Sequence, residues 1–292
     1  MRHIIIIAII SLLPLFADED FLKGVRAEDL MVERIEEAPS EMVKEIEDAG
    51  FDYWFGKTLF SVYSPDSLLL AEIVSNRGLN NGIRLIYRKT KKEVKFIIGG
   101  YNIHWSPNGK FLAYDKMVPC KELYHGRQTY QDGGRWIYNI NENKEERIPI
   151  SDYYDWSPKA NLLAGNQYYG DSLKFVLYDP STAETRLLDK TLFFDFWNFS
   201  WSPDGNMLVY VVATKVEGNV ELSPIESDVF VINRDGTGKM QITHTPEPEI
   251  SVKWLPDGKS IVVERFKQTP DLANGGGSTE IVILKLTKRE KK

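Results

Sequence analysis

The chain has 292 residues, of which 42% are hydrophobic and 27% are charged, a balance typical of a globular protein rather than a disordered one. Its formal charge of −6 argues against a nucleic-acid partner, because binding a phosphate backbone requires a basic face. The single cysteine, Cys120, excludes an internal disulfide, so packing has to stabilise the fold.

The N-terminus has the pattern of an export signal. Met1–His3 carries positive charge, Ile4–Phe16 is apolar apart from a serine and a proline, and Ala17 precedes three acidic residues. This pattern predicts a signal peptide over residues 1–17 and a periplasmic or secreted protein. An uncleaved anchor is the alternative, although the apolar run is shorter than the ~20 residues that a spanning helix needs.

Residues 18–50 are predicted to form a helical leader that precedes the main domain. Pro39 and Ser40 interrupt the pattern, with Ser40 placed to cap a second helix. Apolar residues recur at helical spacing within 27–49, with glutamates between them. These apolar residues are Leu30, Met31, Ile35, Met42, Val43 and Ile46.

A motif then recurs five times and predicts the architecture. Each copy has an aromatic residue, then a Ser-Pro-Asp-Gly-like turn, then an alternating strand. The intervals between the aromatics are 42, 51, 45 and 53 residues, which suits a unit of four strands. We therefore expect an all-β propeller of about five blades, with six as the alternative, over residues 51–292. The aromatics are Tyr63, Trp105, Trp156, Trp201 and Trp254.

One unit carries a family resemblance. Val231–Gly238, Gln241–Thr243 and Trp254–Lys259 resemble a blade of the TolB-type propeller family, and the likeness extends over roughly residues 55–290. The resemblance implies a propeller and, most often, a periplasmic or secreted binding role. The same blade also occurs as the accessory propeller of prolyl-oligopeptidase-like peptidases and of some polysaccharide lyases, so the fold does not settle the function.

The last unit has only three evident strands, because the tail after Leu286 is too charged for a central strand. We expect Phe51–Phe55 to supply the fourth strand, joining the two chain ends and removing an exposed edge. The four tryptophans are expected to occupy equivalent buried positions on the innermost strands.

Catalytic signals are absent from the sequence. It has no Gly-x-Ser-x-Gly elbow, which argues against a serine peptidase. His104, His125 and His244 lie far apart, so no metal-binding cluster is evident. A non-enzymatic role without a cofactor is therefore favoured, with a cation at the channel mouth as the alternative.

The long connections all fall on one end of the propeller. The second-to-third-strand and blade-to-blade connections, here called the loop face, are long, whereas the turn face has only tight turns. Loops on a rigid scaffold usually carry function. The predicted binding residues are Tyr101, Tyr124, Tyr130, Tyr153, Tyr154, Tyr169, Phe193, Phe194 and Trp197, with Trp197 as the main anchor.

Two functions remain open. The first is recognition of a protein or peptide of the cell envelope by aromatic anchors with a polar rim. The second is a carbohydrate-binding or lyase-like propeller, in which tyrosine and tryptophan stack on sugars and carboxylates act as acid, base or cation ligands. Those carboxylates would be Asp52, Asp152, Asp155 and Asp195.

Overall fold

The computed structural model describes residues 21–49, 60–74, 81–124, 127–169, 172–192, 196–215, 226–267 and 278–290. The signal segment and Phe51–Phe55 therefore lie outside the described residues. Within these ranges the chain forms five four-stranded antiparallel sheets, one α-helix and one 3-10 turn. No helix among them is long and apolar enough to cross a membrane.

The five sheets confirm the predicted β-propeller of four-stranded blades. Each blade is an antiparallel meander, numbered here in chain order. Blade 1 contains β2 (Ser61–Tyr63), β3 (Leu69–Val74), β4 (Gly82–Tyr87) and β5 (Glu93–Ile98). Blade 2 contains β6 (Gly100–Trp105), β7 (Phe111–Tyr124), β8 (Arg127–Asn139) and β9 (Lys144–Arg147). Blade 3 contains β10 (Tyr154–Trp156), β11 (Leu163–Tyr169), β12 (Ser172–Asp179) and β13 (Glu184–Leu192). Blade 4 contains β14 (Phe196–Trp201), β15 (Met207–Lys215), β16 (Glu226–Asn233) and β17 (Met240–Gln241). Blade 5 contains β18 (Glu249–Trp254), β19 (Ser260–Phe266), β20 (Thr279–Lys288) and β1 (Leu30–Glu37).

The repeated turn has the predicted chemistry. In blades 2 and 4 the amide of the turn glycine donates to the carbonyl of the first serine, and the glycine adopts positive φ. The buried serine hydroxyl accepts the amide of the residue that opens the next strand, at 3.0 Å in both blades. The motif thus fixes the hairpin through its serine as well as its glycine. The residues are Ser106, Gly109, Phe111, Ser202, Gly205 and Met207.

The tryptophans occupy equivalent positions, since each ends the first strand of its blade, at the blade-to-blade junction. Trp156, Trp201 and Trp254 are buried there as predicted, whereas Trp105 is only partly buried. Three indoles also donate a hydrogen bond to a backbone carbonyl of the preceding blade. The bonds run from Trp105 to Val62 (3.3 Å), from Trp156 to His104 (3.1 Å) and from Trp201 to Asp155 (3.3 Å). The indole of Trp254 is buried, but its Nε1 has no acceptor within the described chain.

This difference gives a matched pair of variants. Trp201→Phe removes a hydrogen bond and leaves the Asp155 carbonyl without its indole donor, whereas Trp254→Phe removes a donor that has no acceptor. We expect Trp201→Phe to lower the free energy of unfolding by about 1 kcal/mol more than Trp254→Phe. Urea unfolding of both variants measures the difference. Equal losses in the free energy of unfolding would contradict a stabilising role for the indole hydrogen bonds between blades.

The N-terminal segment corrects two expectations. Residues 30–37 are not helical but form β1, which pairs antiparallel with β20 and supplies the fourth strand of blade 5. The predicted fourth strand, Phe51–Phe55, was therefore the wrong segment, although an N-terminal strand does complete the blade. The helix that the sequence predicts is confined to α1 (Ser40–Ala49).

A short latch holds this strand in place. The 3-10 turn η1 (Ala27–Asp29) lies against the β16–β17 turn of blade 4, part of the segment that resembles TolB. The Ala27 amide donates to Asn233 Oδ1 at 2.9 Å, and Asn233 Nδ2 donates to Glu28 Oε2 at 2.8 Å. Leu22 and Leu30 are buried in the apolar core between blades 4 and 5, so the segment ties these two blades together.

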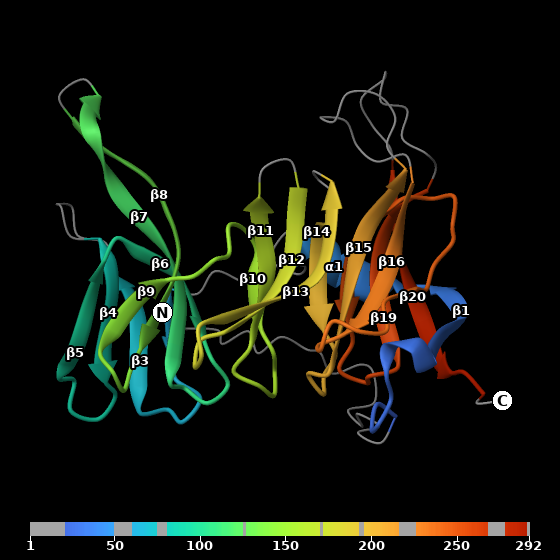
Figure 1. Cartoon of the computed structure of the whole chain (residues 1–292), viewed down its shortest axis with the longest axis horizontal. Helices are drawn as coiled ribbons and strands as arrows, with labels where there is room; N and C mark the ends of the chain where they lie inside the picture. The colour runs from blue at the N-terminus through green and yellow to red at the C-terminus, as the bar shows by residue number, and fades with distance from the viewer. Residues whose placement is uncertain are drawn as a thin grey trace.

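The blades follow one another in chain order along the longest axis of the molecule (Figure 1). In Figure 1, β4 and β5 of blade 1 lie at one end of the longest axis, and β1 and β20 of blade 5 lie at the other. The β7–β8 hairpin rises above the sheets on the loop face. Helix α1 packs Ile46 against Leu255 and Val262, which covers one face of blade 5.

Candidate functional site

A charged and aromatic cluster, here called the Arg135 cluster, lies at the loop-face end of blades 2 and 3. It contains Tyr101, Asn102, Asp115, Asp132, Arg135, Asp152, Tyr154 and Tyr168.

Arg135 is the centre of this cluster. It lies on β8 directly opposite Asp115 on β7, and its Nε is 3.2 Å from Asp115 Oδ1. Its Nη1 donates to both carboxylate oxygens of Asp132, at 3.1 and 3.0 Å. A largely buried guanidinium that is paired with one carboxylate and hydrogen-bonded to another is held in one orientation.

A bulge in β6 supplies the next part of the cluster. The pairing of β6 with β7 shifts register between Tyr101 and His104, and Asn102 within the bulge adopts φ +55°. This turn of the chain lets Asn102 Nδ2 donate to Asp115 Oδ2 at 2.9 Å. Tyr101 is paired with Asp115 across the two strands and stays half-buried at the rim.

The pKa values of the two carboxyl groups beside Arg135 are shifted in opposite directions. Burial raises the pKa of Asp115, although Arg135 and Asn102 oppose the rise. Burial would also raise the pKa of Asp132, but the amide of Gly134 and the Arg135 guanidinium outweigh it and lower that pKa. Asp132 thus remains an ionised acceptor at the exposed rim.

Blade 3 and the segment before it supply the side of the Arg135 cluster that faces away from blade 1. Arg135 Nε donates to the backbone carbonyl of Asp152 at 3.4 Å, and the hydroxyl of Tyr168 donates to Asp152 Oδ2 at 3.2 Å. Tyr168 is 47% exposed, so its ring offers an apolar surface next to the rim carboxylates. The rim of the cluster therefore combines two carboxylates with the rings of Tyr101 and Tyr168.

The structure places the predicted aromatics in different environments. Tyr101 lies in the Arg135 cluster, and its role in binding stays a prediction. Tyr154 is buried in the core, and its hydroxyl forms a hydrogen bond with Asp115. It therefore positions the site instead of contacting a partner. Tyr153 packs 4.9 Å from the ring of Phe199 in the core between blades 3 and 4. The side chains of Tyr124, Tyr130, Tyr169, Phe193, Phe194 and Trp197 lie outside the described part of the chain, so their roles stay predictions.

The carboxylates expected to act in a carbohydrate-active propeller do not lie together in one site. Asp152 is exposed in the Arg135 cluster, whereas Asp155 is on β10, where burial raises its pKa to about 6 and the Trp156 amide and Lys253 oppose the rise. Asp52 and Asp195 lie outside the described residues. The described ranges contain no group of three or more His, Cys, Asp or Glu side chains arranged to hold a metal ion.

His104 does not join the Arg135 network as a charged group. Its Nε2 lies 3.0 Å from Asn102 Oδ1 and its ring packs edge-on against Tyr154. Burial lowers the pKa of His104 to about 4, so the ring is neutral at physiological pH.

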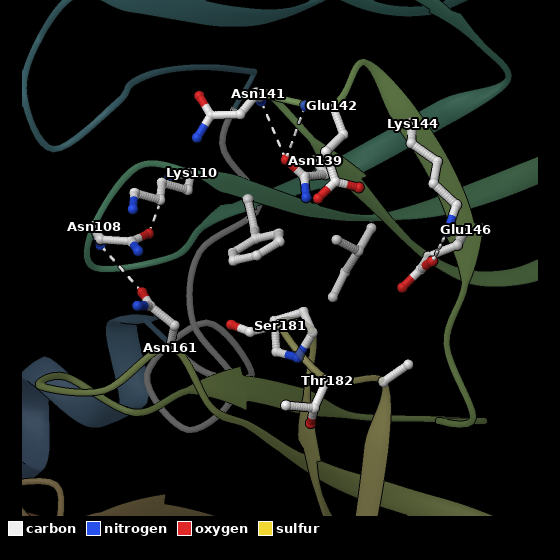
Figure 2. A pocket seen from close by; sticks show the side chains of 14 residues that line it. Asn108, Lys110, Asn139, Asn141, Glu142, Lys144, Glu146, Asn161, Ser181 and Thr182 are labelled. Atoms are coloured by element: carbon white, nitrogen blue, oxygen red, sulfur yellow. Dashed lines mark hydrogen bonds and ion pairs between the residues drawn. The ribbon is translucent and has the colours of Figure 1, made fainter.

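A concave site lies on the turn face. A hollow of about 460 Å³ opens between the tight turns of blades 2 and 3, and Figure 2 shows amide, hydroxyl and charged side chains around it. Two lysines and two glutamates at its rim cancel in charge. The lining side chains include Asn108, Lys110, Phe111, Ile137, Asn139, Asn141, Glu142, Lys144, Glu146, Asn161, Ser181 and Thr182.

Sequence comparisons identify a short region of likeness to curated proteins. No family model matches the chain. Dipeptidyl-peptidase 5 of Porphyromonas gingivalis is 34% identical over 80 residues, which are 27% of this chain and 10% of that protein. The chain therefore aligns with about a tenth of the length of this relative.

Structural comparisons support the propeller fold. The tricorn protease matches with a TM-score of 0.51 and 12% identity, over 80% of this chain and 27% of the other. TolB from Acinetobacter baumannii matches with a TM-score of 0.38 and 18% identity, over 62% of this chain and 42% of the other. At these identities the likeness concerns the fold alone.

Proposed function

We propose that this chain is an exported, non-enzymatic β-propeller that binds a peptide segment of a cell-envelope protein at the Arg135 cluster. The observation that carries the proposal is the pairing of a fixed guanidinium with exposed acceptors, since Arg135 is held by Asp115 and Asp132 while Asp152 and Tyr168 face solvent. A preorganised polar rim beside exposed aromatic surface suits a peptide, because it binds main-chain donors and apolar side chains together.

Charge favours a peptide with a basic side chain or a free amino group at this rim. Arg135 offsets only one negative charge of its two partners, Asp115 and Asp132, and Asp152 adds a further carboxylate, so the edge of the cluster keeps a net negative charge. The short likeness to a dipeptidyl-peptidase agrees with a peptide-related role. We propose binding instead of catalysis because the sequence lacks a nucleophile elbow.

A carbohydrate ligand is the second candidate, and the turn-face hollow is the observation that favours it. Its rim has four asparagine amides together with Ser181 and Thr182, while Phe111 and Pro180 contribute apolar surface. Amides and hydroxyls around an apolar floor suit the hydroxyl groups and the C–H face of a neutral sugar. This site lies on the opposite end of the propeller from the Arg135 cluster, so the two candidates are separable by mutation.

The test is selection of a random peptide library displayed on phage against the full mature protein, followed by calorimetry with the selected peptides. We expect Tyr168→Ala and Asp152→Asn each to weaken binding by at least about 1 kcal/mol, with an unchanged melting temperature. Asn161→Ala in the turn-face hollow is the matched control and should bind normally. Glycan-array binding that is lost in Asn161→Ala and kept in Tyr168→Ala would reject the peptide proposal in favour of the sugar.

A further inference from the structure

The β7–β8 hairpin extends beyond the two strands that flank it in blade 2. Within the described residues, β6 accompanies β7 only as far as Met117, whose amide donates to the Gly99 carbonyl at 2.8 Å. The chain of β9 accompanies β8 only as far as Arg135, whose carbonyl accepts the Ile148 amide at 2.9 Å. Beyond these points β7 and β8 pair only with each other, and the hairpin rises above the sheets (Figure 1). Each of its strands therefore has one edge without a neighbouring strand among the described residues.

The two open edges differ in regularity. The pairing shifts register between Pro119 and Leu123, so residues 120–122 of β7 lie opposite Thr129 alone. Pro119 also lacks the amide hydrogen that an added strand would need. Irregular pairing and proline are features that protect a strand edge from further pairing. Between Gln128 and Asp132, β8 has no proline and contributes consecutive residues to the ladder, so its edge stays regular and open.

Blade 3 shows which element occupies this edge when a blade is fully covered. There the outermost strand, β13, pairs with β12 along its whole length, from Ser172 to Asp179. In blade 2 the outermost strand, β9, covers only Trp136–Asn139 of β8, and the chain then crosses to blade 3. The place of an outermost strand beside Gln128–Asp132 is therefore not filled by the described part of this chain.

The end of this open edge that lies nearest the sheets meets the Arg135 cluster. Asp132 is the last residue of the open stretch, and its carboxylate accepts hydrogen bonds from Arg135 and, at 2.8 Å, from the Gly134 amide. Arg135 also donates to the Asp152 carbonyl in the segment that crosses to blade 3, beside the exposed Tyr168. A strand added along β8 therefore runs into the acidic and aromatic rim of the cluster.

We propose that the peptide adds to blade 2 as a further strand, hydrogen-bonded to the β8 edge over Gln128–Asp132, with its basic group beside Asp132 and Asp152. This binding mode rests on the proposed function and specifies an extended ligand. Main-chain hydrogen bonds then supply affinity, and alternate side chains supply specificity. A helical peptide has its amides bonded internally, so it cannot pair with this edge.

An N-methyl scan of a library-selected peptide, measured by calorimetry against the full mature protein, tests this mode. Successive amides of a strand point to opposite edges, so methylation of every second amide should weaken binding by at least about tenfold, because each loses a hydrogen bond and gains a methyl group in the ladder. Methylation of the intervening amides should leave the Kd within about twofold. A loss of affinity at consecutive amides, or at none, overturns strand addition.

A shortened hairpin provides the second test. Residues 119–130 are replaced by a two-residue Asn-Gly turn, which keeps Asp132 and Arg135 in place. The melting temperature should stay unchanged, whereas peptide binding should weaken by at least about tenfold, because the open edge is removed.

Two substitutions separate this binding mode from the proposed function. If Tyr168→Ala and Asp152→Asn weaken binding while the shortened hairpin binds normally, the peptide occupies the Arg135 cluster without strand addition, and only the binding mode is wrong. If the shortened hairpin loses binding and neither substitution does, the peptide lies on the hairpin alone and the proposed function is wrong. Selection that yields no binding peptide rejects both.

Discussion

Leu30→Ala is expected to destabilise the protein by about 2–5 kcal/mol, the usual cost of truncating a fully buried leucine. Leu30 is the first residue of β1, is 0% exposed and packs into the core between blades 4 and 5. The loss should be accompanied by aggregation, because detachment of β1 exposes the edge of β20.

The adjacent residue provides a control. Met31 is 41% exposed on the same strand, so Met31→Ala should change the free energy of unfolding by less than about 0.5 kcal/mol. Chemical denaturation of both variants measures the contrast. If Leu30→Ala unfolded at the wild-type denaturant concentration, β1 would not be the strand that completes blade 5.

Glu249→Gln is expected to remove a large part of the pH dependence of stability. Burial and the neighbouring Asp228 carboxylate raise the pKa of Glu249 to about 8, although hydrogen bonds from Thr245 and Thr243 oppose the rise. Its ordinary pKa is 4.5, so folding holds a proton that the unfolded chain releases. The stabilising contribution is complete below pH 4.5 and is lost as the pH rises to about 8. At ~1.4 kcal/mol per pKa unit, the loss is roughly 5 kcal/mol.

Melting temperatures measured from pH 5 to pH 9 test this expectation. The wild type should become less stable across the range, whereas Glu249→Gln, which has no proton to release, should be flatter and exceed the wild type at pH 9. Glu184→Gln, which removes a carboxyl from an exposed position, is the control and should follow the wild type. Parallel curves for wild type and Glu249→Gln would show that Glu249 is ionised at neutral pH in the folded protein.

The repeat made the propeller predictable, because aromatic, turn and strand recur at every blade and each local signal agrees with the others. The first strand was missed for a physical reason. β1 shifts register between Val32 and Arg34, and this bulge interrupts the two-residue alternation that identifies a strand. What remains is an apolar spacing that also fits a helix, as Leu30, Met31 and Ile35 show.

The candidate site was only partly accessible from the sequence. Asp115 and Arg135 are opposite charges placed symmetrically about a hairpin, so a cross-strand pair could have been found from their spacing. The repeat also places Tyr154 at the position of Ile103, Phe199 and Val252, which are all buried. This apolar repeat position was a signal that Tyr154 belongs to the core and not to the binding face. The contact of Asp132 with Arg135 could not be predicted, because it depends on a bulge and on Gly134 at φ +89°.

The most direct test of peptide recognition at the Arg135 cluster is a crystal structure of the mature protein bound to a library-selected peptide. Our account predicts that the peptide lies across blades 2 and 3 on the loop face, in contact with Tyr168 and Asp152 and with a basic group beside Asp132. A peptide bound in the turn-face hollow, or along the Phe193–Trp197 segment without contact to the Arg135 cluster, would contradict it.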